Sequence, residues 1–506
     1  MLGSIASPAT EPCPPMDLVQ LIERTLSPIV GGINGVLWNY LLVGVLPLVG
    51  LWFSARLGFI QFRRFPKMIS GLVRGTGDDT AGISPLQSLC TSLASRVGTG
   101  NLVGVAIALT VGGPGAIFWM WLVACFGMAT AYVESALAQL YKRRDAEGQY
   151  RGGPALYMAY GLRKPWLGAI FSVCLILAFG LVFSAVQANS ISEAARGAWG
   201  IEPVWTAAIL VALAAPVIFG GLRRVAKLSE VIVPAMALAY LALAAWVIVS
   251  NLTEVPAMLA LIVRSAFGLD QAAGGVLGGL AVALLNGVKR GLFSNEAGMG
   301  SAPNVAASAT PAPHHPASQG LVQAFGVFVD TLVICTATAL MILLSGALDT
   351  AGGDGVVLTQ QAMAIHFGGW GPVFIAVALS FFALTSILGN YAYAESAVVF
   401  LRGGRAGILL LRLGCLAMVA WGAFAKLDLV WDTADAAMGL MAMVNLIAVM
   451  LLSGVAIKLT RDYDRKIRAG EVSPRLDAAD FPELGDTIDR SIWTAKKTVA
   501  PVVPRT

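Results

Sequence analysis

The chain has 506 residues, of which 57% are hydrophobic and only 12% are charged, and its mean hydropathy is +0.75. Soluble domains carry about 25% charged residues, so this composition excludes an ordinary soluble domain. The net charge of +5 is modest, and the basic residues fall between apolar segments, which excludes a nucleic-acid-binding patch. The apolar residues extend along the whole chain and predict one all-α polytopic membrane domain.

About 11 apolar stretches follow in chain order, each long enough to cross a bilayer as a helix. They run near 33–59, 83–111, 114–141, 166–195, 203–220, 229–250, 273–301, 319–347, 370–401, 405–425 and 433–458. A polar tail and an interfacial helix near 15–28 are expected before them, without a cleaved signal peptide. The charged segment after Arg461 is expected to be a solvated cytoplasmic tail.

The basic residues of the loops predict the orientation. Lys and Arg concentrate in 61–74, 141–164, 223–227, 402–405 and 458–468, whereas alternate connections such as 349–354 are weakly basic or acidic. The positive-inside rule then places the N-terminus outside and the C-terminus in the cytoplasm of a plasma (inner) membrane. In this orientation the second and seventh spans cross the membrane in opposite directions.

This topology predicts two five-helix units of opposite orientation and one additional span at the start. The predicted division is an extracellular N-terminal segment with the interfacial helix (1–32), an extra transmembrane helix with a basic cytoplasmic loop (33–82), a first five-helix repeat (83–250), an inverted second repeat (251–458) and a cytoplasmic C-terminal tail (459–506).

Two of the spans are interrupted by glycines and small polar residues. The second span contains Gly-Thr-Gly-Asn at 98–101, and the seventh contains Phe-Ser-Asn-Glu-Ala-Gly-Met-Gly-Ser at 293–301. A helix broken inside a bilayer leaves backbone groups unpaired, which is tolerated only where they line a cavity and hold a ligand. One break in each half indicates the binding site of an inverted-repeat secondary transporter. The sequence therefore predicts a carrier of a small zwitterion and a cation.

At the first break, a half-helix begins with the N–H groups of Thr99, Gly100 and Asn101, which would bind a carboxylate. The carbonyl groups of Ala94 and Val97, at the end of the preceding half-helix, would face a cation. The alternative is a glycine kink that only permits close helix packing.

At the second break, Ser294 and Asn295 offer side-chain oxygens. Glu296 is an ionisable group near the midplane, which costs roughly 2.5–3.5 kcal/mol unless it has a partner. It would recognise the substrate ammonium or a cation, or it would form a structural ion pair with Arg96 or Arg290. Arg290 lies nearer the outside, where it is expected to form a gate.

Polar residues also interrupt three other spans. Thr385 and Ser386 are adjacent hydroxyls that either bond back to a carbonyl one turn earlier or give a sodium ion hard oxygen ligands. Gln187 either contacts substrate or joins helices. Asp330 either pairs with an arginine or assists a cation. Phe183 is expected to form a wall of the substrate pocket.

Several longer strings resemble the alanine/glycine:cation symporter family. They are 95–101, 112–121, 291–304, 319–323 and the Asp330-Thr331 pair, and the resemblance covers about residues 60–460. It implies a LeuT-type 5+5 inverted-repeat fold, sodium coupling and small neutral amino acids as substrates. More distantly, 98–101 is similar to the unwound segment of the bacterial leucine transporter and 383–386 to its sodium-bearing eighth core helix. Glu296 stands where that transporter has a small hydroxyl residue.

The resemblance and the residues together predict the following site. Substrate would contact Thr99, Gly100, Asn101, Phe183, Gln187, Phe293, Asn295, Glu296 and Met299. Sodium would bind at Ala94, Val97, Phe382, Thr385 and Ser386, with Ser294 as a candidate ligand of a second sodium ion. Phe183, Phe293 and Met299 would close the space above the α-carbon, so that only small side chains fit.

We therefore predict a symporter that imports alanine and glycine with co-transported sodium by alternating access. The partners would be the amino acid and membrane lipid; the sequence does not define the oligomeric state. A proton-coupled symporter is the nearest alternative, and a channel the next, although channels usually repeat broken helices around a symmetric pore. An enzyme is not expected, because the chain has no HExxH motif and only three histidines without metal spacing.

Overall fold

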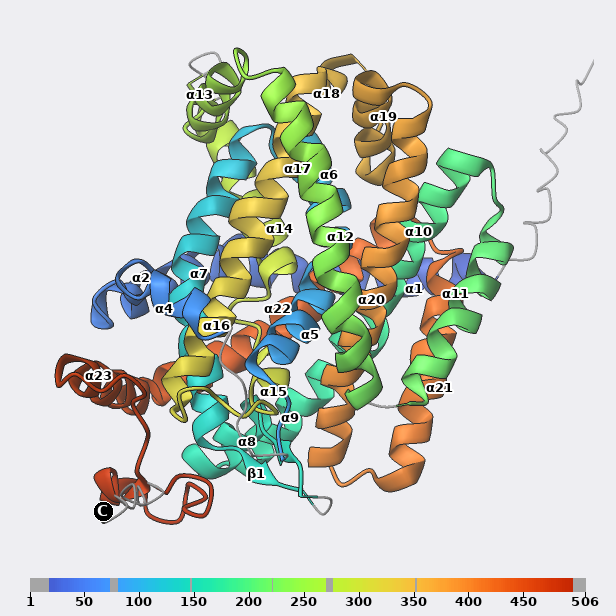
Figure 1. The fold of residues 1–506 in the computed structure, drawn as a ribbon. Helices are drawn as coiled ribbons and strands as arrows, with labels where there is room; N and C mark the ends of the chain where they lie inside the picture. Colours follow the sequence, from blue (N-terminus) through green and yellow to red (C-terminus); the bar gives the residue numbers. More distant parts are fainter. Residues whose placement is uncertain are drawn as a thin grey trace, which may run out of the picture.

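The computed structural model describes residues 18–72, 81–145, 148–220, 222–269, 276–350 and 353–494. This part of the chain is almost entirely helical, and its two strands, β1 (Arg143–Arg144) and β2 (Tyr150–Arg151), pair antiparallel in one hairpin. Figure 1 shows long helices along the height of the molecule, with short helices at both ends. The all-α polytopic fold class is confirmed.

Eight helices of the described residues are long and apolar enough to cross a membrane, and a bent pair makes a ninth span. The bent pair is the predicted second span, broken between Pro85–Arg96 and Gly100–Gly112 with an angle of 51°. The predicted fifth and seventh spans are also helices, of 16 and 20 residues, but neither is among these eight.

The predicted first repeat contains five spans, two of them built from several helical segments. They are α5 (Pro85–Arg96) with η2 (Gly100–Gly104) and α6 (Val105–Gly112), α7 (Gly115–Leu140), α9 (Pro165–Leu175) with η4 (Ile176–Val182) and α10 (Phe183–Trp199), α11 (Pro203–Ile218), and α12 (Leu222–Ser250). The short α8 (Pro154–Leu156) and η3 (Tyr157–Gly161) follow the hairpin.

The predicted second repeat repeats this order. It contains α14 (Val276–Asn295) with the short α15 (Pro303–Ala306), α16 (Pro316–Val327) with η5 (Phe328–Cys335) and α17 (Thr336–Ser345), α20 (Trp370–Phe400), α21 (Gly404–Gly422), and α22 (Leu427–Leu451). Three short helices were not expected from the sequence, and all lie at the top of Figure 1: α13 (Val255–Ala266), α18 (Ala347–Thr350) and α19 (Gly355–Phe367).

The N-terminal prediction was partly wrong. The helix α1 (Leu18–Val36) continues through η1 (Leu37–Leu42) into α2 (Val43–Arg56), so no separate interfacial helix exists in the described residues. Polar side chains fix this helix to α22: the Asn34 amide donates to Asp432 O at 2.9 Å, and the Trp38 indole donates to Asp435 O at 3.1 Å. Residues 1–17 lie outside the described part. The short helices α3 (Ile60–Arg63) and α4 (Phe65–Ser70) follow α2.

The last predicted span was displaced by several residues. It starts at Leu427 rather than near residue 433, and the added first turns contain Asp428 and Asp432, which lower their hydropathy in the sequence. It ends at Leu451, and a separate amphipathic helix, α23 (Ser453–Arg468), follows. The expectation of a solvated tail was also wrong, because most apolar side chains between 474 and 493, including Trp493, are buried.

Candidate functional site

The first break interrupts the helix as predicted. The helix α5 ends at Arg96, and Val97 adopts an extended conformation. The N–H of Gly98 donates to Asn101 Oδ1 at 3.0 Å, so the Ala94 carbonyl lacks the helical partner four residues later. The N–H of Thr99 donates to Gln187 Oε1 at 3.2 Å, which brings Gln187 to the break.

The second break runs from Glu296 to Ala302, between α14 and α15. Glu296, Gly298 and Gly300 have φ angles of 59°, 100° and 78°. These left-handed values are open to glycine at little cost, whereas Glu296 adopts one only because its surroundings hold it there. Asn295, Glu296 and Met299 are all buried.

The two breaks touch each other. An ideal Cβ on Gly100 would lie 3.0 Å from the Cα of Ser294 and 3.1 Å from the Phe293 ring. Two buried polar atoms beside this contact, Thr99 Oγ1 and Asn295 Nδ2, have no hydrogen-bond partner among the described residues. Because buried polar groups are almost always paired, such orphans mark places where a ligand can bind.

Glu296 is held by neutral groups. Its Oε1 accepts from the Ser95 hydroxyl at 2.7 Å, and its Oε2 accepts from the Ser301 hydroxyl at 2.5 Å. Ser95 Oγ also lies 2.6 Å from the side-chain amide of Asn390. Since one hydroxyl has a single proton, Ser95 donates to only one of Glu296 and Asn390 at a time.

The ion pairs expected for Glu296 are not formed within the described part of the chain. Arg290 pairs with Asp435, and Arg96 donates to the carbonyl of Gln323 at 3.3 Å. Glu296 therefore forms no direct ion pair within the described residues, although the buried Arg96 guanidinium is near enough to act on it electrostatically. The Glu296 carboxylate is available to the ammonium group of a substrate.

Asp330 forms a second group of this kind, 0% exposed in η5. Its Oδ1 accepts from the Asn101 amide at 2.8 Å, and its Oδ2 accepts from the hydroxyls of Ser294 at 2.7 Å and Thr331 at 2.8 Å. The arginine partner considered for Asp330 is absent from the described residues, which leaves the cation assignment open to proposal. Asn101 faces this carboxylate with its side chain.

The predicted sodium ligands on α20 lie against the end of α5. The Ser386 hydroxyl is 3.4 Å from Val97 O and 3.0 Å from Phe382 O, and the Thr385 hydroxyl donates to Phe382 O at 2.8 Å. The back-bonding alternative is thus realised within α20. Ser386 in addition reaches the first break, where a Cβ on Gly98 would fall 2.3 Å from its Oγ.

A row of aromatic rings runs outward from the breaks. The ring centroids of Phe183 and Phe293 are 4.6 Å apart, and those of Phe293 and Trp431 are also 4.6 Å apart. The Arg290 guanidinium lies 4.7 Å from the Trp431 ring while it pairs with Asp435. Phe183 and Phe293 therefore meet in one wall, and Arg290 closes the end predicted to face outward.

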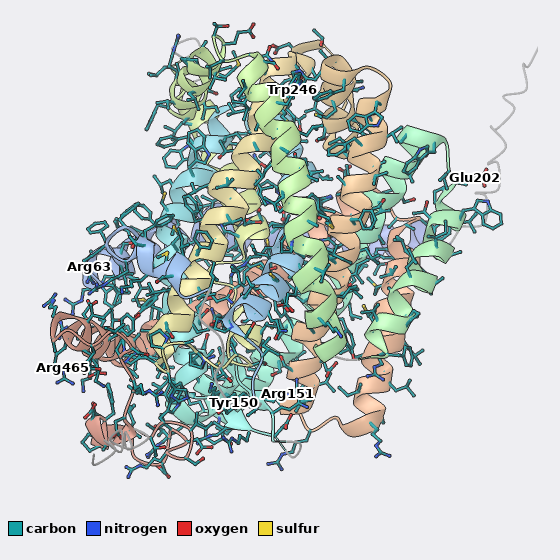
Figure 2. The ribbon with its side chains drawn as sticks, in the orientation of Figure 1. Arg63, Tyr150, Arg151, Glu202, Trp246 and Arg465 are labelled. Carbon is teal, nitrogen blue, oxygen red and sulfur yellow. The ribbon has the colours of Figure 1, made fainter. Side chains whose placement is uncertain are left out.

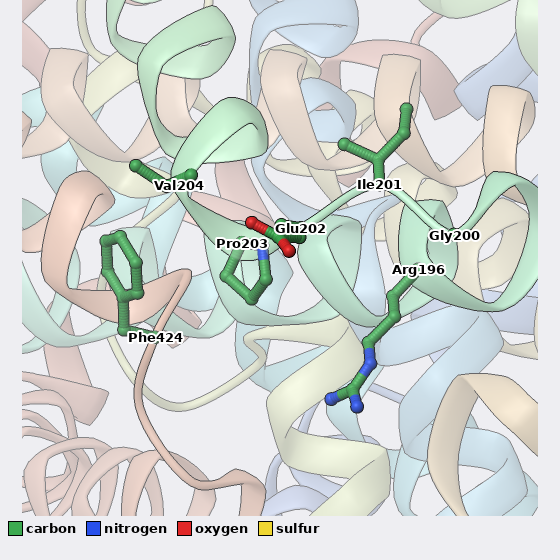
Figure 3. Close-up of a pocket in the computed structure, with 7 residues that line it drawn as sticks. All are labelled: Arg196, Gly200, Ile201, Glu202, Pro203, Val204 and Phe424. Atoms are coloured by element: carbon green, nitrogen blue, oxygen red, sulfur yellow. The ribbon is translucent and has the colours of Figure 1, made fainter.

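A surface pocket lies away from these residues. It has a volume of about 350 Å³ and is lined by Arg196, Gly200, Ile201, Glu202, Pro203, Val204 and Phe424. Figure 3 shows the Arg196 guanidinium directed away from the Glu202 carboxylate, so the two charges do not converge on one ligand. The pocket contains none of the predicted site residues.

Sequence reasoning missed several residues of these clusters. Ser95, Ser301 and Asn390 surround Glu296. Asn445 of α22 donates both to Glu134 at 2.9 Å and to the carbonyl of Gly298 in the second break at 2.9 Å. The available signal was a small polar residue inside an apolar span, although the sequence could not show which of these residues face a break.

Comparisons with known proteins identify the family of the chain. The sodium:alanine symporter family model matches residues 23–478. The chain is 49% identical to the probable sodium/glutamine symporter GlnT of Bacillus subtilis, over 89% of this chain and 93% of that protein. It is 37% identical to the sodium/alanine symporter AgcS of Methanococcus maripaludis, over 90% of this chain and 99% of that protein. A 37% identical protein of Bacillus sp. strain PS3 is named a sodium/proton-dependent alanine carrier, over 79% of this chain and 92% of that one.

A solved structure is similar in fold. The crystal structure of MhsT in complex with L-phenylalanine superposes with a TM-score of 0.52 at 12% sequence identity, over 76% of this chain and 99% of that chain. It has the LeuT fold, so the predicted fold is confirmed. The relatives are transporters, which makes the chain a multi-pass, cation-coupled amino-acid transporter rather than an enzyme. The chain belongs to the sodium:alanine symporter family.

Proposed function

We propose that this transporter is a sodium-coupled symporter that imports small neutral amino acids, alanine and glycine, across the plasma membrane. The observation that carries the proposal is the contact between the two breaks, with Thr99 Oγ1 and Asn295 Nδ2 unpaired beside it. The substrate carboxylate would take backbone N–H groups of Gly100 and Asn101, and the ammonium group would face Glu296.

One sodium ion would bind between α5 and α20. The carbonyl oxygens of Ala94 and Val97 are released from the end of α5, and Ser386 already reaches Val97 O. Together with Phe382 O and the Thr385 hydroxyl, they supply only hard oxygen ligands, the type that such a cation prefers. A cation there would join the first break to α20.

A second sodium ion would bind at Asp330. Ser294, the predicted ligand, donates to this carboxylate, and Thr331 adds a second hydroxyl oxygen. A buried carboxylate with only neutral partners is costly, and a bound cation would offset that cost. Because Asn101 and Ser294 belong to the two breaks, a cation there would also order the substrate site.

The transport cycle would alternate access to the breaks. On the side predicted to face outside, the Arg290–Asp435 ion pair would block access to the breaks, next to the rings of Trp431 and Phe293. Toward the predicted cytoplasm, a short parallel bridge joins Ile83 to Ala309. We infer that substrate and sodium enter when the first closure opens and leave when the second opens.

Two alternatives have specific support. The name of GlnT favours glutamine as substrate, and the name of the strain PS3 carrier favours protons as an additional coupling ion. Uptake of labelled alanine and glutamine into proteoliposomes, with sodium and proton gradients imposed separately, tests all three. Sodium-driven alanine uptake that exceeds glutamine uptake is expected. Uptake driven by the proton gradient alone would overturn the sodium assignment.

A further inference from the structure

The end of the described chain, residues 474–493, packs against the transporter instead of extending into solvent; we name it the C-terminal clasp. Its apolar side chains enter the hydrophobic core, namely Leu476, Ala478, Phe481, Leu484, Ile488, Ile492 and Trp493. In Figure 1 it lies below α23, at the end of the molecule that carries β1 and α8. This is the end predicted to face the cytoplasm.

Trp493 fixes the clasp. Its side chain is fully buried, and its indole N–H donates to the carbonyl of Leu140, at the end of α7, at 3.1 Å. Its ring centroid lies 4.9 Å from that of His314 and 5.1 Å from Lys142 Nζ. Near the other end of the clasp, the N–H of Leu476 donates to His314 O at 3.0 Å. The clasp therefore holds α7 and the loop after α15 together.

Charge complementarity sets the register of the clasp. Lys458 pairs with Glu483 at 2.9 Å, and Lys466 pairs with Asp480 at 3.1 Å. Arg143 donates to the carbonyl of Thr487 at 2.7 Å. Figure 2 places Tyr150 and Arg151 at the same end of the molecule. Exposed ion pairs contribute little free energy, so we attribute docking mainly to the buried apolar residues.

The bridge between Ile83 and Ala309 lies next to the clasp. Ile83 precedes the first broken helix; its N–H donates to Ser308 O at 3.0 Å, and its carbonyl accepts from the N–H of Thr310 at 2.9 Å. Lys142 Nζ donates to Ala309 O at 3.0 Å while it lies beside the Trp493 ring. In the proposed cycle, Ile83 and Ala309 would separate when the transporter opens to this face.

We propose that the C-terminal clasp is an autoinhibitory strap that holds the Ile83–Ala309 bridge closed. This inference rests on the alternating access of the proposed function. The contacts of the clasp with Leu140, Lys142 and His314 stabilise the closed bridge, so release of the clasp shifts the population toward the state open to this face. Until it is released, the clasp slows delivery of substrate to this side.

Hydrogen exchange of the full chain in lipid nanodiscs tests the strap. The variant is Trp493→Ala, and the matched control is Thr494→Ala, an exposed neighbour. Exchange is measured without substrate at three amides: Ala478, which donates to Trp493 O at 2.8 Å, and Ile83 and Thr310 of the bridge. We expect all three to exchange at least ~3-fold faster in Trp493→Ala, because the clasp and the bridge open together. The control should match the unmodified protein.

Each other outcome contradicts the proposal. If Ala478 exchanges faster while Ile83 and Thr310 remain protected, the clasp does not hold the bridge. If Ala478 remains protected, Trp493 is not the anchor. Leu476→Ala removes a buried side chain at the other end of the clasp, and it must also speed exchange at Ala478, Ile83 and Thr310. Because Leu476 is far along the clasp from Trp493, this result would show that release of the clasp, and not local damage at α7, is the cause. The proposed function fails independently, through absence of sodium-driven alanine uptake by the unmodified protein.

Discussion

Gly100 of the first broken helix packs directly against Ser294 near the end of α14. A Cβ on Gly100 would be 3.0 Å from Ser294 Cα, a distance that backbone atoms can relieve only by moving apart. The first break therefore contains glycine at this position because the second break occupies the space of a side chain. In the proposed cycle this contact would couple the substrate site to the cation site, because Ser294 also donates to Asp330.

Substitution of Gly100 should separate the breaks. We expect Gly100→Ala to weaken alanine binding at least ~5-fold, because overpacking typically costs about 1–3 kcal/mol. Gly104→Ala is the matched control, since its Cβ would meet the Trp431 ring at 3.6 Å, Thr99 O at 3.8 Å and Arg290 Cδ at 4.0 Å, which are all ordinary contacts. Alanine affinity, measured by equilibrium binding, should be close to that of the unmodified protein in the control. Equal affinity in both variants would contradict the role of the close approach.

Removal of the hydroxyls of α20 should weaken sodium binding specifically. We expect the double variant Thr385→Val, Ser386→Ala to raise the sodium concentration for half-maximal uptake about 10-fold or more, because each lost ligand leaves the cation less well coordinated. The alanine concentration for half-maximal uptake at saturating sodium should change little. Ser380→Ala, which removes a hydroxyl one to two turns away on the same helix, is the control. An unchanged sodium dependence would place the ion elsewhere.

Neutralisation of Asp330 should remove one cation from the cycle. In Asp330→Asn the side chain retains its size and its contacts with Asn101 and Thr331, but it loses the negative charge. We expect the Hill coefficient for sodium to fall toward one, with a loss of affinity of about 10-fold or more, as expected for a charge-assisted contact. Sodium titration of alanine uptake provides the measurement. Unaltered cooperativity would make Asp330 a structural residue.

Substrate size should be limited by the aromatic wall. Phe183 and Phe293 are in contact, and each excess methylene would have to displace packed atoms at about 1–3 kcal/mol. We expect glycine and alanine to compete well for uptake, serine weakly, and leucine and phenylalanine hardly at all. Met299→Ala should admit larger aliphatic substrates at some cost in alanine affinity. Strong competition by leucine in the unmodified protein would refute the small pocket.

Acid should weaken the attachment of α23 near the clasp. Burial lowers the pKa of His315 from its usual 6.5, although Asp462 opposes this shift. His315 Nδ1 accepts from the N–H of Ala317 at 3.1 Å, a bond that protonation of Nδ1 would remove. Burial also raises the pKa of Asp462, but its bonds to His315 and Lys466 outweigh that effect and lower it to about 2.

Both lowered pKa values make the folded state less stable as the pH falls. A histidine whose pKa is lowered on folding stabilises the folded state above about pH 6.5, and this contribution is lost as the pH falls below that value. We expect the melting temperature to fall between pH 7.5 and pH 5, and the fall to be smaller in His315→Gln. His366→Gln, on a different helix, should keep the full dependence. An identical slope in both variants would contradict the role of His315.

The sequence predicted the breaks well, because their signals are local. Glycines and hydroxyls inside an apolar span reveal broken helices at 98–101 and 293–301 without any knowledge of neighbours. The partners of Glu296 and Arg290 were not predictable in the same way. Hydrogen bonds from Ser95 and Ser301, and the pairing of Arg290 with Asp435, depend on side chains that approach one another only after folding.

The ends of the chain were predicted least well, for a related physical reason. The residues after Arg461 are charged, and composition alone therefore indicated a solvated tail. The buried positions of Leu476 and Trp493 arise from contacts with α7 and the loop at His314, distant in the sequence. The start of α22 was missed for a similar reason, because Asp428 and Asp432 make residues 427–432 polar and the contact of Asp432 O with Asn34 forms only after folding.

Equilibrium binding of alanine to the purified protein at graded sodium concentrations tests the central claim most directly. Potassium replaces sodium to keep the ionic strength constant. If cations at Asp330 and at Ser386 order the two breaks, the dissociation constant for alanine falls steeply as sodium rises, and alanine tightens sodium binding by the same factor. The same alanine affinity in sodium and in potassium would contradict the account.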